Sequence, residues 1–304
     1  MQSILKIIFL YLSIITLTLA LSECKNKEDV FVDQTILTPT LSLGSGLVPY
    51  KTTVHFQSNQ TNAILEYSLD NGKSWQAGDS VQLESSVNIQ VRNRIDKNVS
   101  TTATNSYTLK FEKVLIIGNS ITRHNSAPEI GWKGDWGMAA SAADKDYVSL
   151  VKKYLSSRNS TTQFLVTNKG SSFEVNYGDN FDWSLFNNEL AFKPDLIIVR
   201  IGDNVEDKKV NERQFEVHFE KLIAYLTSFD FRGKVICTGS FWERWESSFA
   251  IERVCKRKGY SYIELTSLNT QKNTAYNQFI NQAVSSHPSD RGMEEIYKRL
   301  TPYF

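Results

Sequence analysis

Cysteine and histidine are scarce in this sequence, and neither is clustered. The 304-residue chain has three cysteines, too few for a disulfide framework. Its four histidines are widely spaced, at His55, His124, His218 and His287. No pair has the short spacing of a zinc motif, so the sequence predicts no metal site. Cys237 and Cys255 fall in a predicted strand and a predicted helix and are expected to be buried, unreactive thiols.

Net charge is also nearly absent. The chain carries 34 Lys and Arg residues against 33 Asp and Glu residues, a formal net charge of +1. Proteins that bind DNA or RNA usually show a clear basic excess, so no nucleic-acid partner is expected. Hydrophobic residues make up 41% of the chain and charged residues 22%, which is typical of a globular protein rather than a disordered one.

The apolar run near the N-terminus is too short for a membrane span. Residues 7–21 form an uncharged run of 15 residues after Lys6. A membrane-spanning helix needs about 20 apolar residues, whereas this length fits the hydrophobic region of a signal peptide. We therefore predict a signal peptide over residues 1–23 and an exported protein.

The end of this run resembles a bacterial lipobox, whose cysteine becomes the lipidated first residue of the mature protein. Residues 21–24 read Leu-Ser-Glu-Cys, and Glu23 departs from the small residue expected before the cysteine. Lipidation of Cys24 would anchor the protein in a membrane, with residues 24–34 as a polar tether. The alternatives are an outer-membrane or cell-surface lipoprotein, or ordinary cleavage that leaves a periplasmic or secreted protein.

Residues 35–111 show the alternating pattern of β-strands and no helical pattern. Apolar residues alternate around residues 54–56, 65–69, 87–91 and 107–111, and Asp70-Asn71-Gly72 is a hairpin-turn signal. We predict a small all-β sandwich. The stretch 64–91 resembles the Ig-like modules appended to chitobiase-type glycosidases, which implies either a spacer or a sugar-binding accessory module.

From residue 112 the pattern changes to alternating strands and helices. Strands are expected over residues 114–117, 164–166, 196–199, 235–237 and 262–265, with helical apolar stripes around residues 147–155, 215–226 and 293–300. This order predicts an α/β domain over residues 112–304: a flavodoxin-like, three-layer α/β/α sandwich with a five-stranded parallel sheet. Ligands of such sheets bind at the carboxyl ends of the strands.

Four motifs follow these strands in chain order. They contain Ser120 after the first strand, Gly170 after the second, Asn204 after the third and His287 after the fifth. The chain here resembles the SGNH (GDSL-type) hydrolases over about residues 113–304. The resemblance implies a serine esterase without metal or organic cofactor. Each motif taken alone could instead be structural, as a helix cap, a turn glycine or an Asx turn.

The resemblance also implies the role of each residue. Ser120 would be the nucleophile and His287 the general base. The oxyanion hole would consist of the backbone N–H groups of Ser120 and Gly170 and the side-chain amide of Asn204. Glycine at position 170 would let the backbone N–H approach the substrate without an intervening side chain.

The sequence departs from the family at the residue that orients the histidine. The family usually has Asp-x-x-His, but this chain has Val284 three residues before His287. Three alternatives follow: a backbone carbonyl near Val284 or Ser285 holds the imidazole, a carboxylate from elsewhere does so, or catalysis is weakened. We favour the first, and expect Val284→Asp to raise turnover if the loop admits the carboxylate. Asn119 also replaces the aspartate of the commoner Gly-Asp-Ser motif.

Tryptophans suggest the substrate class. Four lie in expected loops on the active-site side: Trp132, Trp136, Trp242 and Trp245. Aromatic faces suit sugar rings, although each ring could instead pack a loop. Residues 127–138 also look like a loop of carbohydrate-active SGNH members, and no long apolar stripe for a fatty acyl chain lies near Ser120. We expect an acetylxylan-esterase-like enzyme of polysaccharide degradation that removes acetyl groups from an acylated glycan. The alternatives are a glycan-binding lipoprotein with weakened catalysis, or a lipase or thioesterase.

The anchor prediction can be tested directly. We expect the mature protein to begin at Cys24 and to partition with membranes, and we expect Cys24→Ala to release it, because the lipid chains supply the membrane affinity. Mass spectrometry of the mature N-terminus is the measurement. An unmodified N-terminus at another residue would show ordinary signal-peptide cleavage instead.

Overall fold

The structure is a computed structural model, and it describes residues 35–304. The expected signal peptide, Cys24 and the tether up to residue 34 lie outside the described residues. Residues 37–304 form one compact unit. Within the described part of the chain, no helix combines the length and the apolar character that crossing a membrane requires.

Residues 40–110 form two β-sheets, in keeping with the alternating sequence pattern. One sheet has the order β1-β3-β6; the other has the order β2-β9-β7-β4-β5, with β8 paired to β7. The strands are β1 Thr40–Leu41, β2 Gly46–Pro49, β3 Thr53–Gln57, β4 Ile64–Ser68, β5 Gln76–Ala77, β6 Ser80–Gln82, β7 Val87–Ile95, β8 Asn98–Val99 and β9 Ala103–Lys110. The Ig-like character of this segment and the boundaries of the two expected domains stay predictions.

The expected five-stranded parallel sheet is present. Its strands are β10 Lys113–Gly118, β11 Gln163–Thr167, β12 Leu196–Arg200, β13 Lys234–Thr238 and β14 Ser261–Ile263. They pair in parallel in the order β11-β10-β12-β13-β14, which is the 2-1-3-4-5 order of flavodoxin-like sheets. The strands occur where the apolar runs predict them, although β14 ends two residues earlier than expected.

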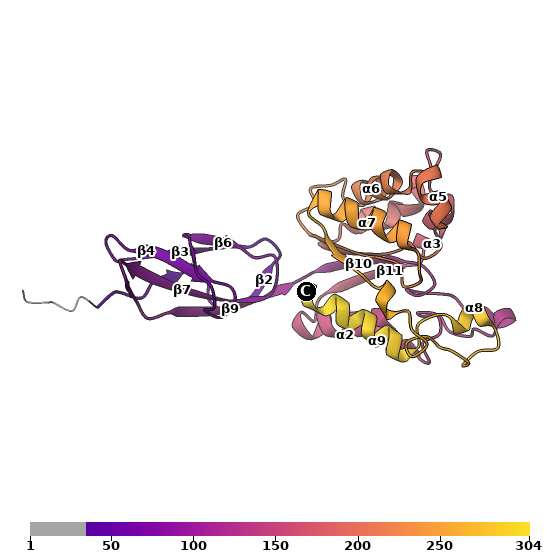
Figure 1. Cartoon of the computed structure of the whole chain (residues 1–304), viewed down its shortest axis with the longest axis horizontal. Coiled ribbons are helices and arrows are strands. Elements are labelled where there is room, and N and C mark those ends of the chain that lie inside the picture. The colour runs from indigo at the N-terminus through magenta and orange to yellow at the C-terminus, as the bar shows by residue number, and fades with distance from the viewer. Residues whose placement is uncertain (1–34) are drawn as a thin grey trace, which may run out of the picture. The chain divides into compact units, whose positions relative to one another are not determined.

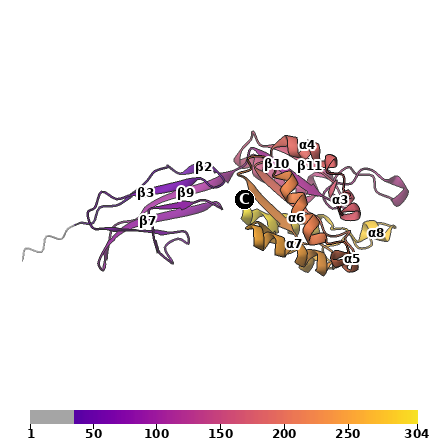
Figure 2. The same cartoon turned by 90° about the horizontal axis from the view of Figure 1, so that it is seen from above.

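Helices cover both faces of this sheet (Figures 1 and 2). Alternate residues of each strand belong to opposite cores: Val114 packs with α2 and α9, whereas Leu115 packs with α3, α6 and α7. Burial on both faces explains why these strands are continuous apolar runs. The helices are α2 Tyr147–Arg158, α3 Gly170–Asn176, α4 Asn187–Phe192, α5 Asp207–Glu212, α6 Phe215–Leu226, α7 Trp245–Lys258, α8 Gln282–Ser285 and α9 Asp290–Leu300.

The start of α9 differs from the simplest interpretation of the sequence. Asp290 stands where a helix cap is expected, but Ser289 is the N-cap, and its hydroxyl accepts from the N–H of Gly292. The carboxylate of Asp290 instead accepts from the backbone N–H and the hydroxyl of Ser141, at 2.7 and 2.6 Å. Asp290 therefore ties the long loop after β10 to the last helix.

Candidate active site

Ser120 and His287 meet at the carboxyl edge of the parallel sheet. Ser120 lies in the turn after β10, and His287 lies between α8 and α9. The Oγ of Ser120 is 2.8 Å from the Nε2 of His287, whose side chain is almost fully buried. A neutral imidazole can accept the serine proton at Nε2 only if its own proton is on Nδ1.

A backbone carbonyl faces that second nitrogen. The Nδ1 of His287 is 2.7 Å from the carbonyl oxygen of Ala283, in helix α8. Because a carbonyl can only accept a hydrogen bond, this contact requires the proton on Nδ1 and leaves Nε2 free to accept from Ser120. The carbonyl is one residue earlier than the sequence analysis expected.

The residue at the position of the family aspartate is part of the core. Val284 is fully buried in an apolar cluster with Ala127, Trp132, Met138, Ala139 and Ala275. A carboxylate at position 284 would enter this cluster, where burial of a polar group without partners costs free energy. The expectation that Val284→Asp raises turnover therefore does not fit the packing.

Trp242 shields the imidazole. Its ring meets the ring of His287 edge to face, with centroids 5.0 Å apart, and its Nε1 donates to the carbonyl of Ser286 at 3.1 Å. Burial lowers the pKa of His287 to about 4, because the charged imidazolium loses its hydration, and the hydrogen bond to Ala283 opposes this only in part. The imidazole of His287 is therefore neutral at physiological pH.

The three expected oxyanion donors also lie at this edge. Gly170 begins α3 after a two-residue link from β11, and Asn204 lies exposed in the loop after β12. Within residues 35–304, neither the backbone N–H of Ser120 nor that of Gly170 donates to a protein acceptor. Both remain available to a bound oxyanion.

The packing around position 170 gives a second reason for glycine there. A Cβ on Gly170 would lie 2.4 Å from the carbonyl oxygen of Gly118 and 2.6 Å from a methyl group of Ile201. Real atoms do not approach this closely, so a side chain would push α3 away from the end of β10. Packing between two strand ends therefore requires glycine here, and the access of a substrate to its N–H stays a prediction.

A buried carboxylate that the sequence analysis missed lies behind these donors. Glu174, on α3, is 1% exposed. Its Oε1 accepts from the N–H of Gly202 at 2.6 Å and the N–H of Asn204 at 3.3 Å, and its Oε2 accepts from the Nδ2 of Asn204 at 2.7 Å. The Nδ2 of Asn119 is 3.1 and 3.3 Å from the two oxygens. The only sequence signal is an acidic residue beside Phe173 on a helix with a buried face.

Asp203 extends this network toward the neighbouring strand. Its Oδ2 accepts from Arg200 at 2.6 Å and from the Nδ2 of Asn119 at 2.8 Å. Its Oδ1 accepts from the hydroxyl of Ser240 at 2.9 Å and the N–H of Phe241 at 2.8 Å. Asp203 therefore joins the loops after β10, β12 and β13.

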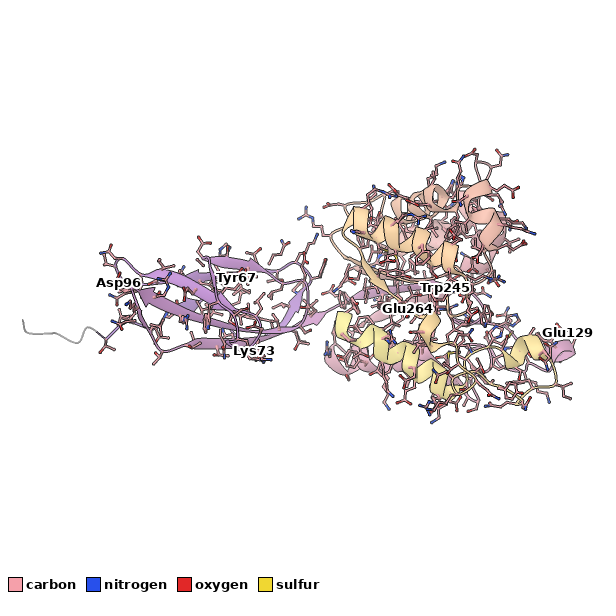
Figure 3. All side chains as sticks on the ribbon, viewed as in Figure 1. Tyr67, Lys73, Asp96, Glu129, Trp245 and Glu264 are labelled. Atoms are coloured by element: carbon pink, nitrogen blue, oxygen red, sulfur yellow. The ribbon has the colours of Figure 1, made fainter. Side chains whose placement is uncertain are left out.

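The four tryptophans proposed for substrate binding lie in different environments. Trp132 is 3% exposed, packs against Trp136 and Phe279, and donates from its Nε1 to the carbonyl of His124. The prediction that Trp132 binds substrate is wrong, because its ring supports the loop. Trp136 is half-buried, and Trp245 is the exposed first residue of α7 (Figure 3) rather than a loop residue; their roles stay predictions.

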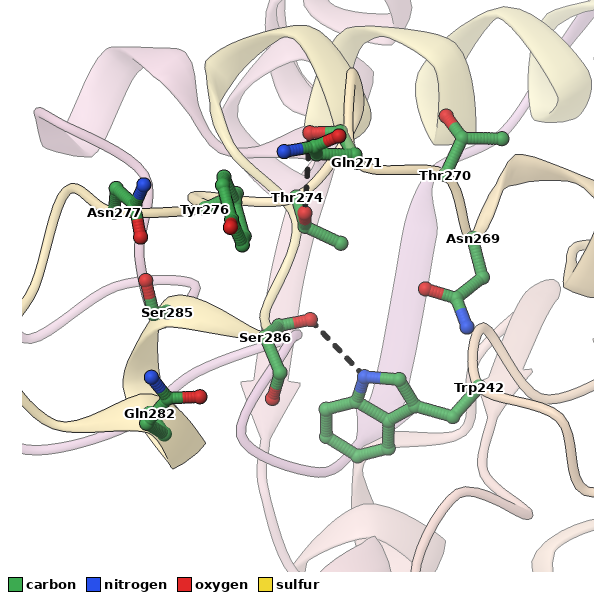
Figure 4. Close-up of a pocket in the computed structure, with 10 residues that line it drawn as sticks. All are labelled: Trp242, Asn269, Thr270, Gln271, Thr274, Tyr276, Asn277, Gln282, Ser285 and Ser286. Atoms are coloured by element: carbon green, nitrogen blue, oxygen red, sulfur yellow. Dashed lines mark hydrogen bonds between the residues drawn. The ribbon is translucent and has the colours of Figure 1, made fainter.

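A pocket of about 270 Å³ lies between Trp242 and the segments around residues 269–277 and 282–286 (Figure 4). Trp242, whose ring contacts His287, forms one wall, and Ser286, the neighbour of His287 in the chain, forms another. The remaining lining residues are Asn269, Thr270, Gln271, Thr274, Tyr276, Asn277, Gln282 and Ser285. All the lining side chains are uncharged, and they offer amides, hydroxyls and two aromatic rings.

No protein-family model matches the chain, and no curated protein matches it. Solved structures with low similarity include a two-domain esterase active on acetylated mannans, with 14% identity and a TM-score of 0.44. The match covers 63% of this chain and 48% of that esterase. A family two carbohydrate esterase from Cellvibrio japonicus has 14% identity and TM-score 0.38, with 87% of this chain and 86% of that chain covered. A salicylyl-acyltransferase from a tetracycline biosynthetic pathway has 11% identity and TM-score 0.42, with 80% and 73% covered. At similarities this low, the geometry of the site decides which function to propose.

The lowered pKa of His287 gives a testable pH dependence. The folded protein binds the imidazole proton near pH 4, whereas the unfolded chain binds it near pH 6.5. The neutral imidazole of His287 therefore makes its full contribution to the free energy of unfolding above pH 6.5. This contribution is lost as the pH falls toward 4. In an NMR titration, we expect the His287 imidazole signals to stay in the neutral form from pH 8 to about pH 5. A midpoint at or above 6.5 would contradict the buried, carbonyl-held imidazole.

Proposed function

We propose that this chain is a serine esterase of the SGNH type that removes short acyl groups from a glycan. The observation that carries the proposal is the relay from Ser120 to His287 to the carbonyl of Ala283, with distances of 2.8 and 2.7 Å. A serine hydroxyl paired with a correctly oriented neutral imidazole is the arrangement that activates a nucleophile for acyl transfer.

The reaction follows from these positions. The Oγ of Ser120 attacks the ester carbonyl carbon while its proton passes to the Nε2 of His287. The negative charge on the carbonyl oxygen is stabilised by the N–H groups of Ser120 and Gly170 and by the amide of Asn204. As the intermediate collapses, the leaving alcohol takes the proton from Nε2 and an acyl-serine remains. A water molecule, deprotonated by His287, then releases the carboxylic acid and restores Ser120.

The pocket lined by Trp242, whose ring contacts His287, supports a glycan as the alcohol part of the ester. Amides and hydroxyls match the hydrogen-bonding groups of a sugar, and the rings of Trp242 and Tyr276 offer apolar faces to its C–H groups. Because the lining side chains are uncharged, the pocket suits a neutral sugar better than a uronic acid. We propose acetyl as the acyl group and, with export at the N-terminus, an extracytoplasmic polysaccharide as the substrate.

The esterase proposal is tested by removing the nucleophile. We expect Ser120→Ala to lower turnover of 4-nitrophenyl acetate by about 10⁴-fold or more, because the acyl-enzyme route needs the hydroxyl. The circular dichroism spectrum should not change, and a fluorophosphonate probe should label Ser120 in the wild type only. Retained turnover in Ser120→Ala, or labelling of another residue, would reject the proposal. A preference for long acyl esters over acetyl would favour a lipase.

The glycan proposal is tested at the rim of the pocket. Tyr276 is 54% exposed there, and we expect Tyr276→Ala to raise KM for acetylated neutral oligosaccharides by about 10-fold, which corresponds to roughly 1.4 kcal/mol of stacking. Turnover of 4-nitrophenyl acetate, which has no sugar, should stay within about twofold. Phe249→Ala, at an aromatic residue on α7 that is 45% exposed and outside the pocket, is the matched control. Equal effects of both substitutions on KM would argue against this pocket as the sugar site.

A further inference from the structure

We infer that Glu174 is the positioning residue of the oxyanion hole: its ionised carboxylate holds the amide of Asn204 with nitrogen, rather than oxygen, toward the acyl group. The inference deepens the proposed function and rests on it. Two hydrogen bonds carry it, because Oε2 of Glu174 accepts from the Nδ2 of Asn204 at 2.7 Å while Oε1 accepts from the N–H of the same residue at 3.3 Å.

The chemistry of the two groups makes the orientation obligatory. An ionised carboxylate can only accept hydrogen bonds, so a neighbouring amide must turn its NH₂ group toward it. One hydrogen of Nδ2 is then used by Glu174, and the second remains for a substrate oxyanion. If the amide rotated by half a turn, the Oδ1 of Asn204 would face the developing negative charge and would repel it.

Glu174 is held in place from several sides. Besides Asn204, its carboxylate receives the N–H of Gly202 and the Nδ2 of Asn119, so it connects the loop that carries Ser120 with the loop that carries Asn204. Because the side chain is 1% exposed, water cannot replace these donors when one of them is lost. These contacts fix the position of Glu174, so that its charge acts on the amide of Asn204.

The charge of this carboxylate depends on its surroundings. Burial and the nearby carboxylate of Asp203 raise the pKa of Glu174 to about 7, and hydrogen bonds from Asn204 and Gly202 oppose the rise. The other charged or titratable groups around it are Arg200, which is paired with Asp203, and Tyr177, Glu206, Lys209 and Arg213, which line a small pocket with Glu174 and Asn204. When Glu174 is protonated, its O–H group is a donor that faces other donors, including the N–H of Gly202 and the Nδ2 of Asn204. The carboxyl group then no longer fixes the orientation of the Asn204 amide.

The pH dependence of the wild type is the first measurement. We expect kcat for 4-nitrophenyl acetate to rise with pH through an ionisation near 7, well above the ionisation of His287 near 4. Glu174→Gln should abolish that ionisation and lower kcat by about 10- to 100-fold, with KM within about twofold, because the lost interaction acts on the transition state. Glu66→Gln, which removes a carboxylate paired with Arg92 and Arg94 on β7, is the control and should leave the profile unchanged.

A double-mutant cycle then tests whether Glu174 acts through Asn204. Asn204→Ala should lower kcat by about 100- to 1000-fold and should also remove the ionisation near pH 7. Adding Glu174→Gln to Asn204→Ala should cost no more than about twofold, since the group that Glu174 positions is gone. Effects that multiply, or an ionisation that persists in Asn204→Ala, would overturn the inference.

Failure of the inference can be told apart from failure of the proposed function. If Ser120→Ala abolishes activity while Glu174→Gln retains the rate and the pH profile of the wild type, only the inference is wrong. If Ser120→Ala stays active, the proposed function is wrong. If Glu174→Gln does not fold, as judged by its melting temperature, the inference is tested by the pH dependence of kcat in the wild type and in Asn204→Ala.

Discussion

The candidate site depends on a buried carboxylate that satisfies backbone and side-chain donors from two loops at once. Parallel strands end at the same edge of a sheet, but nothing in the sheet itself fixes the loops that follow. Here Glu174 accepts hydrogen bonds from N–H groups in the loops after β10 and β12. Asp203 accepts one from the loop after β13, so all three loops are connected. Charge-assisted hydrogen bonds in a dry environment are strong, so the edge behaves as one preorganised unit.

The imidazole of His287 is oriented by an uncharged group. The carbonyl of Ala283 selects the same imidazole tautomer that a carboxylate would select, but it gives the imidazolium only a dipole as a partner. Burial beside Trp242 lowers the pKa of His287, and the hydrogen bond to Ala283 opposes this only in part. A histidine with a low pKa is a weak acceptor of the serine proton, but its imidazole stays unprotonated at physiological pH.

The sequence predicted the sheet and the pairing of Ser120 with His287 because both leave local signals. Apolar runs mark strands buried on both faces, and Ser120 and His287 stand in short motifs at strand ends. Glu174 was not predictable in the same way, because a carboxylate on a short helix has no motif. The missing aspartate pointed to a backbone carbonyl as the partner of His287, but it did not show that Ala283 supplies it, since a carbonyl is present at every residue. Trp132 was misjudged because a loop residue can be as buried as a core residue when the loop folds on itself.

The placement of the orienting carbonyl links reactivity to local folding. Helix α8, which carries Ala283, is only four residues long, and so short a helix has little stability of its own. Two contacts attach it to the rest of the chain: Val284 packs in the apolar cluster, and the hydroxyl of Ser285 donates to the carbonyl of Ala275 at 2.7 Å. If this turn opens, the imidazole loses its tautomer while the sheet and both helical layers remain intact. Heat inactivation would then precede global melting, and cooling would reverse it.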